Sequence, residues 1–106
     1  DIIEAAKIQI ENTYMAENIS LNTVAASVGM SPSYFSSVFS REVGKTFMEY
    51  LTETRMEKAK ELLMCSPLKT SEIGYEVGYK DPHYFSYIFK KTQGCSPKDY
   101  RARRKE

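Results

Sequence analysis

The segment PSYFSSVFSREVG (residues 32–44) recurs in closely similar form as PHYFSYIFKKTQG (residues 82–94). When residues 21–50 are aligned with residues 70–100, allowing one extra residue in the second copy, nine positions are identical. The identical pairs are Val28/Val77, Gly29/Gly78, Pro32/Pro82, Tyr34/Tyr84, Phe35/Phe85, Ser36/Ser86, Phe39/Phe89, Gly44/Gly94 and Tyr50/Tyr100. A matched set of glycines, prolines and aromatic residues indicates a repeated supersecondary unit.

Each copy has the residues that two short helices and a tight turn require. In the first copy, a Ser cap, a turn Gly, a Ser-Pro helix start and a terminal Gly stand at Ser20, Gly29, Ser31–Pro32 and Gly44. The corresponding residues of the second copy are Thr70 or Ser71, Gly78, Asp81–Pro82 and Gly94. Small residues at Ala25 and Gly74 allow the two helices of each pair to approach closely. The pattern predicts two helix-turn-helix units.

Helical periodicity divides each second helix into two faces. At about 100° per residue, one face collects apolar residues and the other collects polar ones. The inward sets are Phe35, Val38 and Phe39, then Phe85, Ile88 and Phe89. The outward sets are Ser33, Ser36, Ser37 and Ser40, then His83, Ser86, Tyr87 and Lys90. We therefore expect the repeated aromatic residues to be core, and the outward faces, which differ between copies, to recognise a ligand.

The segment between the copies is rich in strong helix formers and contains no Gly or Pro before Pro67. A helix over residues 47–64 would be about 27 Å long at about 1.5 Å per residue. We expect it to hold apart two helices meant for successive major grooves, which lie about 34 Å apart. Within it, Arg55 is expected to lay its stem on the core. The prediction is an all-α chain of about seven helices, divided into a first helix-turn-helix subdomain (1–46), a linker helix (47–64) and a second subdomain (65–106).

Charge is distributed unevenly along the chain, although its formal net charge is only +1. Residues 1–50 contain three basic and six acidic side chains, whereas residues 51–106 contain twelve and eight. The second half should therefore attract an anion more strongly than the first. The basic tail KDYRARRKE (residues 98–106) has an alternative interpretation as a solvated helix end, where cations complement the helix dipole.

Several functional classes fit the composition poorly. The single histidine and two cysteines, Cys65 and Cys95, lack the spacing of a metal site, and we expect both thiols to be reduced. No nucleophile with a base or paired carboxylates is evident, so we predict neither an enzyme nor a cofactor. No apolar run of about 18 residues could cross a bilayer, and we expect a cytoplasmic protein. The chain opens at Asp1 within an expected helix, which suggests a missing upstream segment.

The segments RMEKAKELL (residues 55–63) and IGYEVGYKDPHYFSYIFKKTQGCSPKDYR (residues 73–101) resemble the signature of the AraC/XylS transcriptional regulators. The resemblance extends over nearly the whole chain. The chain looks especially like the output domains of two-component response regulators. It implies two helix-turn-helix units joined by a long helix, which bind double-stranded promoter or operator DNA and regulate bacterial transcription. It further suggests RNA polymerase as a partner and dimerisation through the missing N-terminal domain.

By the same resemblance, base edges would be contacted from the outward positions of the two second helices. These positions are Ser33, Ser36 and Ser37, then His83, Ser86 and Tyr87. The cations expected to contact phosphates are Arg41, Lys45, Lys80, Lys90, Lys91, Lys98 and Arg101. Family members often carry Arg where Tyr87 stands, and the first face here offers only serines. Because neither face has the arginine that reads guanine, we expect weak direct readout.

A second function remains open at the level of sequence. The first copy is net acidic, and its serine face would also suit a protein partner. In that alternative the chain is a protein-interaction module and DNA binding is weak or secondary. Salt dependence separates the two, since release of counterions makes DNA binding fall steeply as salt rises.

Overall fold

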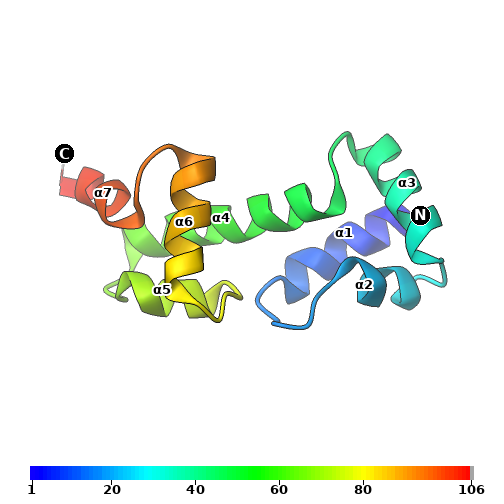
Figure 1. Ribbon diagram of the computed structural model, residues 1–106, viewed down its shortest axis with the longest axis horizontal. Helices are drawn as coiled ribbons and strands as arrows, with labels where there is room; N and C mark the ends of the chain where they lie inside the picture. The colour runs from blue at the N-terminus through cyan, green and yellow to red at the C-terminus, as the bar shows by residue number, and fades with distance from the viewer. Residues whose placement is uncertain (106) are drawn as a thin grey trace. The chain divides into compact units, whose positions relative to one another are not determined.

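The structure, a computed structural model, describes residues 1–105 and contains helices but no strand within them. Within the described residues, seven α-helices and a 3-10 helix follow one another (Figure 1). They are α1 (Ile2–Thr13), α2 (Leu21–Ser27), α3 (Pro32–Val43), α4 (Phe47–Cys65), α5 (Thr70–Glu76), α6 (Pro82–Gln93), α7 (Pro97–Ala102) and η1 (Arg103–Lys105). The predicted all-α class with about seven helices is confirmed.

The chain divides into two compact units, and the boundary between them in the sequence falls within α4. Unit 1 comprises Asp1–Thr54 and contains α1, α2, α3 and the first turns of α4. Unit 2 begins at Arg55 and contains the rest of α4 with α5, α6 and α7. The long helix expected over residues 47–64 is thus present, while the division of the chain at residues 46/47 and 64/65 stays a prediction.

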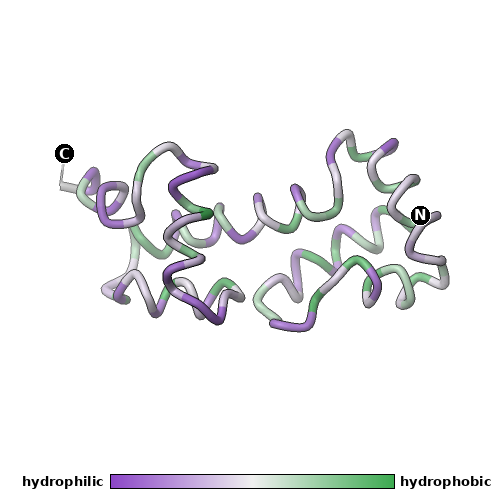
Figure 2. The backbone as a smooth tube through the Cα atoms, viewed as in Figure 1, coloured by the Kyte–Doolittle hydropathy of each residue, from purple (hydrophilic) through white to green (hydrophobic). Residues whose placement is uncertain are grey.

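The boundaries of α3 and α6 are set by the capping residues that the repeat predicted. The Ser31 hydroxyl accepts a hydrogen bond from the Tyr34 amide at 3.3 Å, and Asp81 Oδ1 accepts one from the His83 amide at 2.9 Å. A proline follows each cap at the first helical position. Gly44 and Gly94 end the helices in the left-handed conformation, with φ of 83° and 86°. Figure 2 shows the ends of α6 as hydrophilic, with hydrophobic residues between them.

In unit 2, a close approach of α5 and α6 depends on the absence of a side chain at Gly74. A Cβ atom added there would lie 3.1 Å from Phe85, which is tighter than ordinary packing. The turn that follows is closed by a 2.9 Å hydrogen bond from the Tyr79 amide to the Gly74 carbonyl. In unit 1 the corresponding bond joins the Met30 amide to the Ala25 carbonyl at 3.0 Å. Both units therefore contain the predicted helix-turn-helix.

The start of α5 differs in one detail from the sequence-based expectation. The helix begins at Thr70, but neither the Thr70 nor the Ser71 hydroxyl caps it. Instead, the Glu72 carboxylate accepts a 2.8 Å hydrogen bond from the Lys69 amide. An acidic side chain in the first turn thus satisfies an amide that the helix itself leaves unpaired.

Phenylalanine rings form the centre of each core. Phe35, Phe39, Phe85 and Phe89 are fully buried, as the repeat predicted. The Phe39 and Tyr50 rings lie 5.6 Å apart at 81°, and the equivalent Phe89 and Tyr100 rings lie 5.7 Å apart at 75°. Edge-to-face contacts of this kind are attractive, because the face of an aromatic ring is partly negative and its edge is partly positive. The same aromatic pair therefore closes both units.

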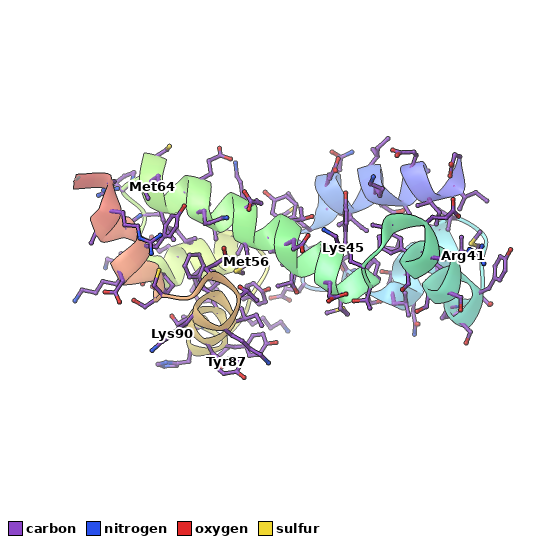
Figure 3. The ribbon with its side chains drawn as sticks, turned by 90° about the horizontal axis from the view of Figure 1, so that it is seen from above. Arg41, Lys45, Met56, Met64, Tyr87 and Lys90 are labelled. Atoms are coloured by element: carbon purple, nitrogen blue, oxygen red, sulfur yellow. The ribbon has the colours of Figure 1, made fainter. Side chains whose placement is uncertain are left out.

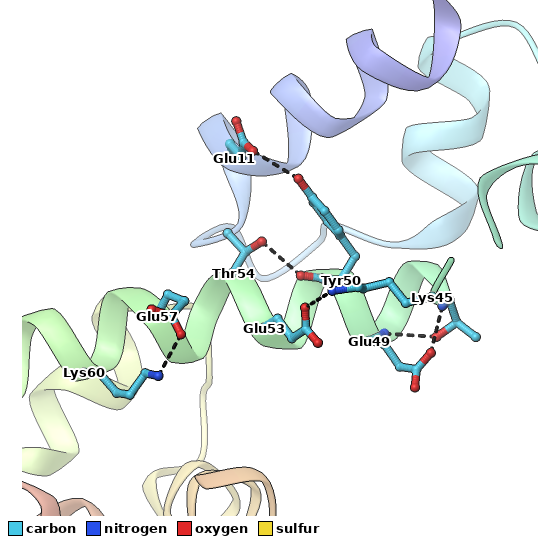
Figure 4. A network of polar contacts seen from close by, with 9 residues as sticks. Glu11, Lys45, Glu49, Tyr50, Glu53, Thr54, Glu57 and Lys60 are labelled. Carbon is cyan, nitrogen blue, oxygen red and sulfur yellow. Dashed lines mark hydrogen bonds and ion pairs between the residues drawn. The ribbon is translucent and has the colours of Figure 1, made fainter. Parts of the chain in front are cut away.

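Tyr50 also ties α4 to α1 within unit 1. Its hydroxyl donates a 3.0 Å hydrogen bond to the Glu11 carboxylate (Figure 4). The pKa of Tyr50 is raised to about 12. Partial burial is the largest cause, and the hydrogen bond to Glu11 and the negative charge of Glu11 add to it. The neutral phenol is therefore the form that the folded unit favours.

The expectation that all repeated aromatic residues are core is wrong for one pair. Tyr34 and Tyr84 are 60% and 50% exposed. Each stands one position before a buried phenylalanine, so the helix rotates it by about 100° to the flank of the core. Arg55, in contrast, lies where the sequence placed it: it is 8% exposed, with its guanidinium 4.9 Å from the centre of the Tyr79 ring.

Candidate nucleic-acid interface

The outward face of α3 is a small polar surface. Ser33 and Ser37 are exposed and Ser36 is half-buried. These positions lie on the second helix of the unit 1 helix-turn-helix, the element that enters the major groove when such a motif binds DNA. A serine hydroxyl can both donate and accept a hydrogen bond, so this face can suit several base edges. None of these three positions carries an arginine or a lysine.

The outward face of α6 is larger and carries more varied chemistry. His83, Ser86 and Tyr87 are all exposed, and Tyr87 is 58% exposed. Figure 3 shows Tyr87 and Lys90 projecting from α6 on the side away from α4. The helix thus presents a polar group, an aromatic ring and a cation on one accessible surface. Contact of these residues with bases stays a prediction.

Cations follow the outward face of α6 towards the C-terminal end of the helix. Lys90 and Lys91 are exposed in the last turn, and the Lys91 ammonium lies 5.8 Å from the centre of the Tyr87 ring. Lys80, in the turn before α6, and Lys98, in α7, are also exposed. The four lysines are candidates for phosphate contacts from unit 2.

The cations of unit 1 are fewer, and two of the three, Lys7 and Lys45, are already paired with carboxylates. Arg41 is exposed in the last turn of α3. Lys45 donates to the Glu53 carboxylate at 2.6 Å, as Figure 4 shows. Unit 1 contains three basic and seven acidic side chains, for a net charge of −4, whereas unit 2 contains twelve and seven, for +5. The charge asymmetry predicted from the sequence coincides with the division into units.

Arg101 occupies a different environment from the other predicted phosphate ligands. It is half-buried, and it donates from Nε to the Leu63 carbonyl and from Nη2 to the Ser66 carbonyl, both at 3.1 Å. Arg104 Nη1 donates to the same two carbonyls at 3.2 Å. The last carbonyls of a helix have no partner within it and carry a partial negative charge. Two arginines of the basic tail therefore cap α4, a role that the sequence analysis did not identify.

Residues 1–105 offer few features of other kinds of site. Within this range no three His, Cys, Asp or Glu side chains are grouped so as to hold a metal ion. In the same range, no helix combines the length and apolar character needed to span a membrane. Cys65 and Cys95 are both free thiols.

Comparison with known proteins places this architecture in a family. A family model described as a helix-turn-helix domain matches residues 24–103. The arabinose operon regulatory protein of Escherichia coli (strain K12) is 35% identical over 85 residues, which cover 80% of this chain but only 29% of that protein. The chain spans less than two thirds of the length of this and other curated relatives.

Solved structures give the same result. The C-terminal domain of AraT, a response regulator from Geobacillus stearothermophilus, is 41% identical, with a TM-score of 0.95 over 97% of this chain and 85% of that one. The DNA-binding domain of AdpA, solved in complex with a target DNA, shares the fold at 24% identity, with a TM-score of 0.90 over 96% of this chain and 91% of that one. The chain belongs to the AraC/XylS family of helix-turn-helix transcription regulators.

Proposed function

We propose that this chain binds double-stranded DNA sequence-specifically through α3 and α6 and thereby regulates bacterial transcription. The chain has two helix-turn-helix units, and each exposes the outward face of its second helix. One exposed polar helix would not indicate DNA binding, because many surface helices are polar. The two copies have equivalent caps, the same turn glycines and the same buried phenylalanines, but most of their outward residues differ. A protein that recognises two different DNA segments needs this combination.

The proposal gives the two units different parts in binding. Unit 2, with net charge +5, supplies most of the attraction to phosphates, through Lys80, Lys90, Lys91 and Lys98. Unit 1 contributes Arg41, and also Lys45 when a phosphate replaces Glu53 as its partner. Base edges are contacted by Ser33, Ser36 and Ser37 and by His83, Ser86 and Tyr87. We leave Arg101 out of the phosphate set because its donors already serve the end of α4.

Relatives of the chain support this assignment. The AdpA domain, which shares the fold, was solved with a target DNA, and several curated relatives are named as regulators of operons. Because those relatives are longer, we propose that this chain is the DNA-binding module of a regulator that acts in the cytoplasm, dimerises through an upstream domain and contacts RNA polymerase.

Titration of a labelled duplex at two salt concentrations tests the proposal. When log affinity for duplex DNA is plotted against log salt concentration, each phosphate neutralised by a cation makes the slope more negative by about 0.9. We expect a steep negative slope, and a sequence selected from a random pool to bind more tightly than a scrambled one. A flat slope without sequence preference would contradict the proposal and favour the protein-interaction alternative. Lys58→Gln on α4, where Lys58 pairs with Glu61, is a matched control that should leave the slope unchanged.

A further inference from the structure

A row of three tyrosine rings runs along one flank of the unit 2 helix-turn-helix. The Tyr79 and Tyr84 ring centres lie 5.7 Å apart, and the Tyr84 and Tyr87 centres lie 6.2 Å apart. These distances fall within the range in which aromatic rings attract one another. Tyr79 is buried, whereas Tyr84 and Tyr87 are 50% and 58% exposed. The row therefore leads from the core of unit 2 to the surface proposed to read DNA.

Both ends of the row are held by cations. At the inner end, the Arg55 guanidinium lies 4.9 Å from the Tyr79 ring centre, and Arg55 is 8% exposed. At the outer end, the Lys91 ammonium lies 5.8 Å from the Tyr87 ring centre. A cation within about 6 Å of an aromatic ring is attracted to its face. Tyr87 is thus flanked by Tyr84 on one side and Lys91 on the other.

Unit 1 has no equivalent of this row. The positions aligned with Tyr79 and Tyr87 are Met30 and Ser37. Tyr34, which aligns with Tyr84, is 60% exposed and makes no ring contact with another side chain among residues 1–105. The repeat therefore places a tyrosine at the same position in both units. Only Tyr84, in unit 2, lies against another aromatic ring.

We propose that Tyr84 is a positioning residue for DNA recognition by α6, which acts by holding the Tyr87 ring in one orientation. This inference rests on the proposed function, because it assigns Tyr87 to a base contact. An exposed tyrosine on a helix can occupy more than one rotamer, and a ring fixed before binding loses less conformational freedom when it meets a base. Discrimination by Tyr87 should therefore depend on Tyr84, although Tyr84 itself touches no base.

A double-mutant cycle tests this dependence. The probes are a selected duplex and duplexes with a single substituted base pair; the informative position is the one at which Tyr87→Ala removes discrimination. We expect Tyr84→Ala to lower discrimination at that same position about three- to tenfold, the range expected for freeing one side chain. Tyr84→Phe keeps the ring and should keep the discrimination. Tyr84→Leu still covers Tyr79 but offers no aromatic ring, so it should lower discrimination as Tyr84→Ala does. This variant excludes unfolding as the cause of the lost discrimination.

The cycle and its control decide between the possible roles of Tyr84. In the Tyr87→Ala background, Tyr84→Ala should have no further effect on discrimination. An undiminished effect in that background would overturn the proposal and assign Tyr84 a base contact of its own. Unchanged discrimination in Tyr84→Ala and Tyr84→Leu would also overturn it, while leaving DNA binding by α6 intact. Failure of the unmodified chain to bind any duplex would instead refute the proposed function, and this inference with it. Tyr34→Ala, the matched control in unit 1, should leave this base position unaffected.

Discussion

Arg101 donates a hydrogen bond to the carbonyl of Leu63, a residue 38 positions earlier in the chain, with Nε and O 3.1 Å apart. The bond joins α7 to the end of α4 within unit 2. It gives part of the basic tail a role in holding the fold together, while its contact with phosphates stays a prediction. A cation at this place complements both the unpaired carbonyls and the helix dipole.

Replacing Arg101 should therefore affect stability more than DNA binding. We expect Arg101→Ala to lower the free energy of unfolding by about 2 kcal/mol, the value typical of hydrogen bonds made by a charged group. Arg101→Lys should restore only part of this loss, because an ammonium cannot span two carbonyls as the guanidinium fork does. Denaturant unfolding measures both variants.

Lys98→Ala provides the control for Arg101. Lys98 is exposed on the same helix and is a proposed phosphate ligand, so its loss should reduce the salt dependence of DNA binding but hardly change stability. If Arg101→Ala instead reduced the salt dependence and left the unfolding free energy unchanged, Arg101 would be a phosphate ligand after all.

The aromatic centres of the two units make a second prediction. Phe39 and Phe89 are fully buried, so Phe39→Ala and Phe89→Ala should each cost about 3–5 kcal/mol of stability. Thermal or denaturant unfolding should show this loss, with base preference unaltered in whatever protein remains folded. Ser86→Ala, an exposed change on the same helix as Phe89, should leave stability nearly unchanged. A stable Phe89→Ala protein with altered base preference would contradict this prediction, because it would mean that Phe89 faces the DNA and not the core.

Alkaline pH should reveal the contact between Tyr50 and Glu11. The pKa of Tyr50 is about 12 in the folded chain, above the ordinary value of 10.0. The raised pKa means that the folded state holds the phenolic proton more tightly than the unfolded state does. The stabilisation is therefore complete below about pH 10 and is lost as the pH rises towards 12.

Tyr50→Phe isolates this contribution from that of other groups that titrate at high pH. We expect the difference in unfolding free energy between the parent chain and Tyr50→Phe to shrink between about pH 10 and pH 12. A difference that stays constant over this range would show that the Tyr50 phenol is not held in its neutral form.

The outer cations of α6 should determine much of the salt dependence. Lys90 and Lys91 are both exposed, so the double variant Lys90→Gln, Lys91→Gln should reduce the salt slope by roughly two and weaken binding to all duplexes. Arg41→Gln with Lys45→Gln should have a smaller effect, since Lys45 is already paired with Glu53. Equal effects of the two double variants would contradict the proposed dominance of unit 2.

The sequence predicted the features of the fold that depend on residues close together in the chain. The caps at Ser31 and Asp81, the turns at Gly29 and Gly78 and the buried phenylalanines all follow from local geometry and helical period, and the structure contains each of them. A repeat makes such signals stronger, because the same residue types recur at the same spacing.

Features that depend on distant contacts were not predictable in the same way. Nothing near Arg101 in the sequence indicates that its guanidinium reaches Leu63.

The exposure of Tyr84 was missed because a repeated aromatic residue is usually a core residue, whereas this one lies at the flank of the helix and packs on its neighbours. The polar faces of α3 and α6 were correctly placed outward, but their contact with bases stays a prediction.

Selection of bound duplexes from a random pool is the most direct test of the central claim that α3 and α6 both read DNA. We expect the selected sequences to contain two separate blocks of preferred bases. Tyr87→Ala should relax one block only, and the joint replacement of Ser33, Ser36 and Ser37 by alanine should relax only the other. Selection of no common sequence, or of a single block unaffected by Tyr87→Ala and by the serine replacements, would contradict the claim.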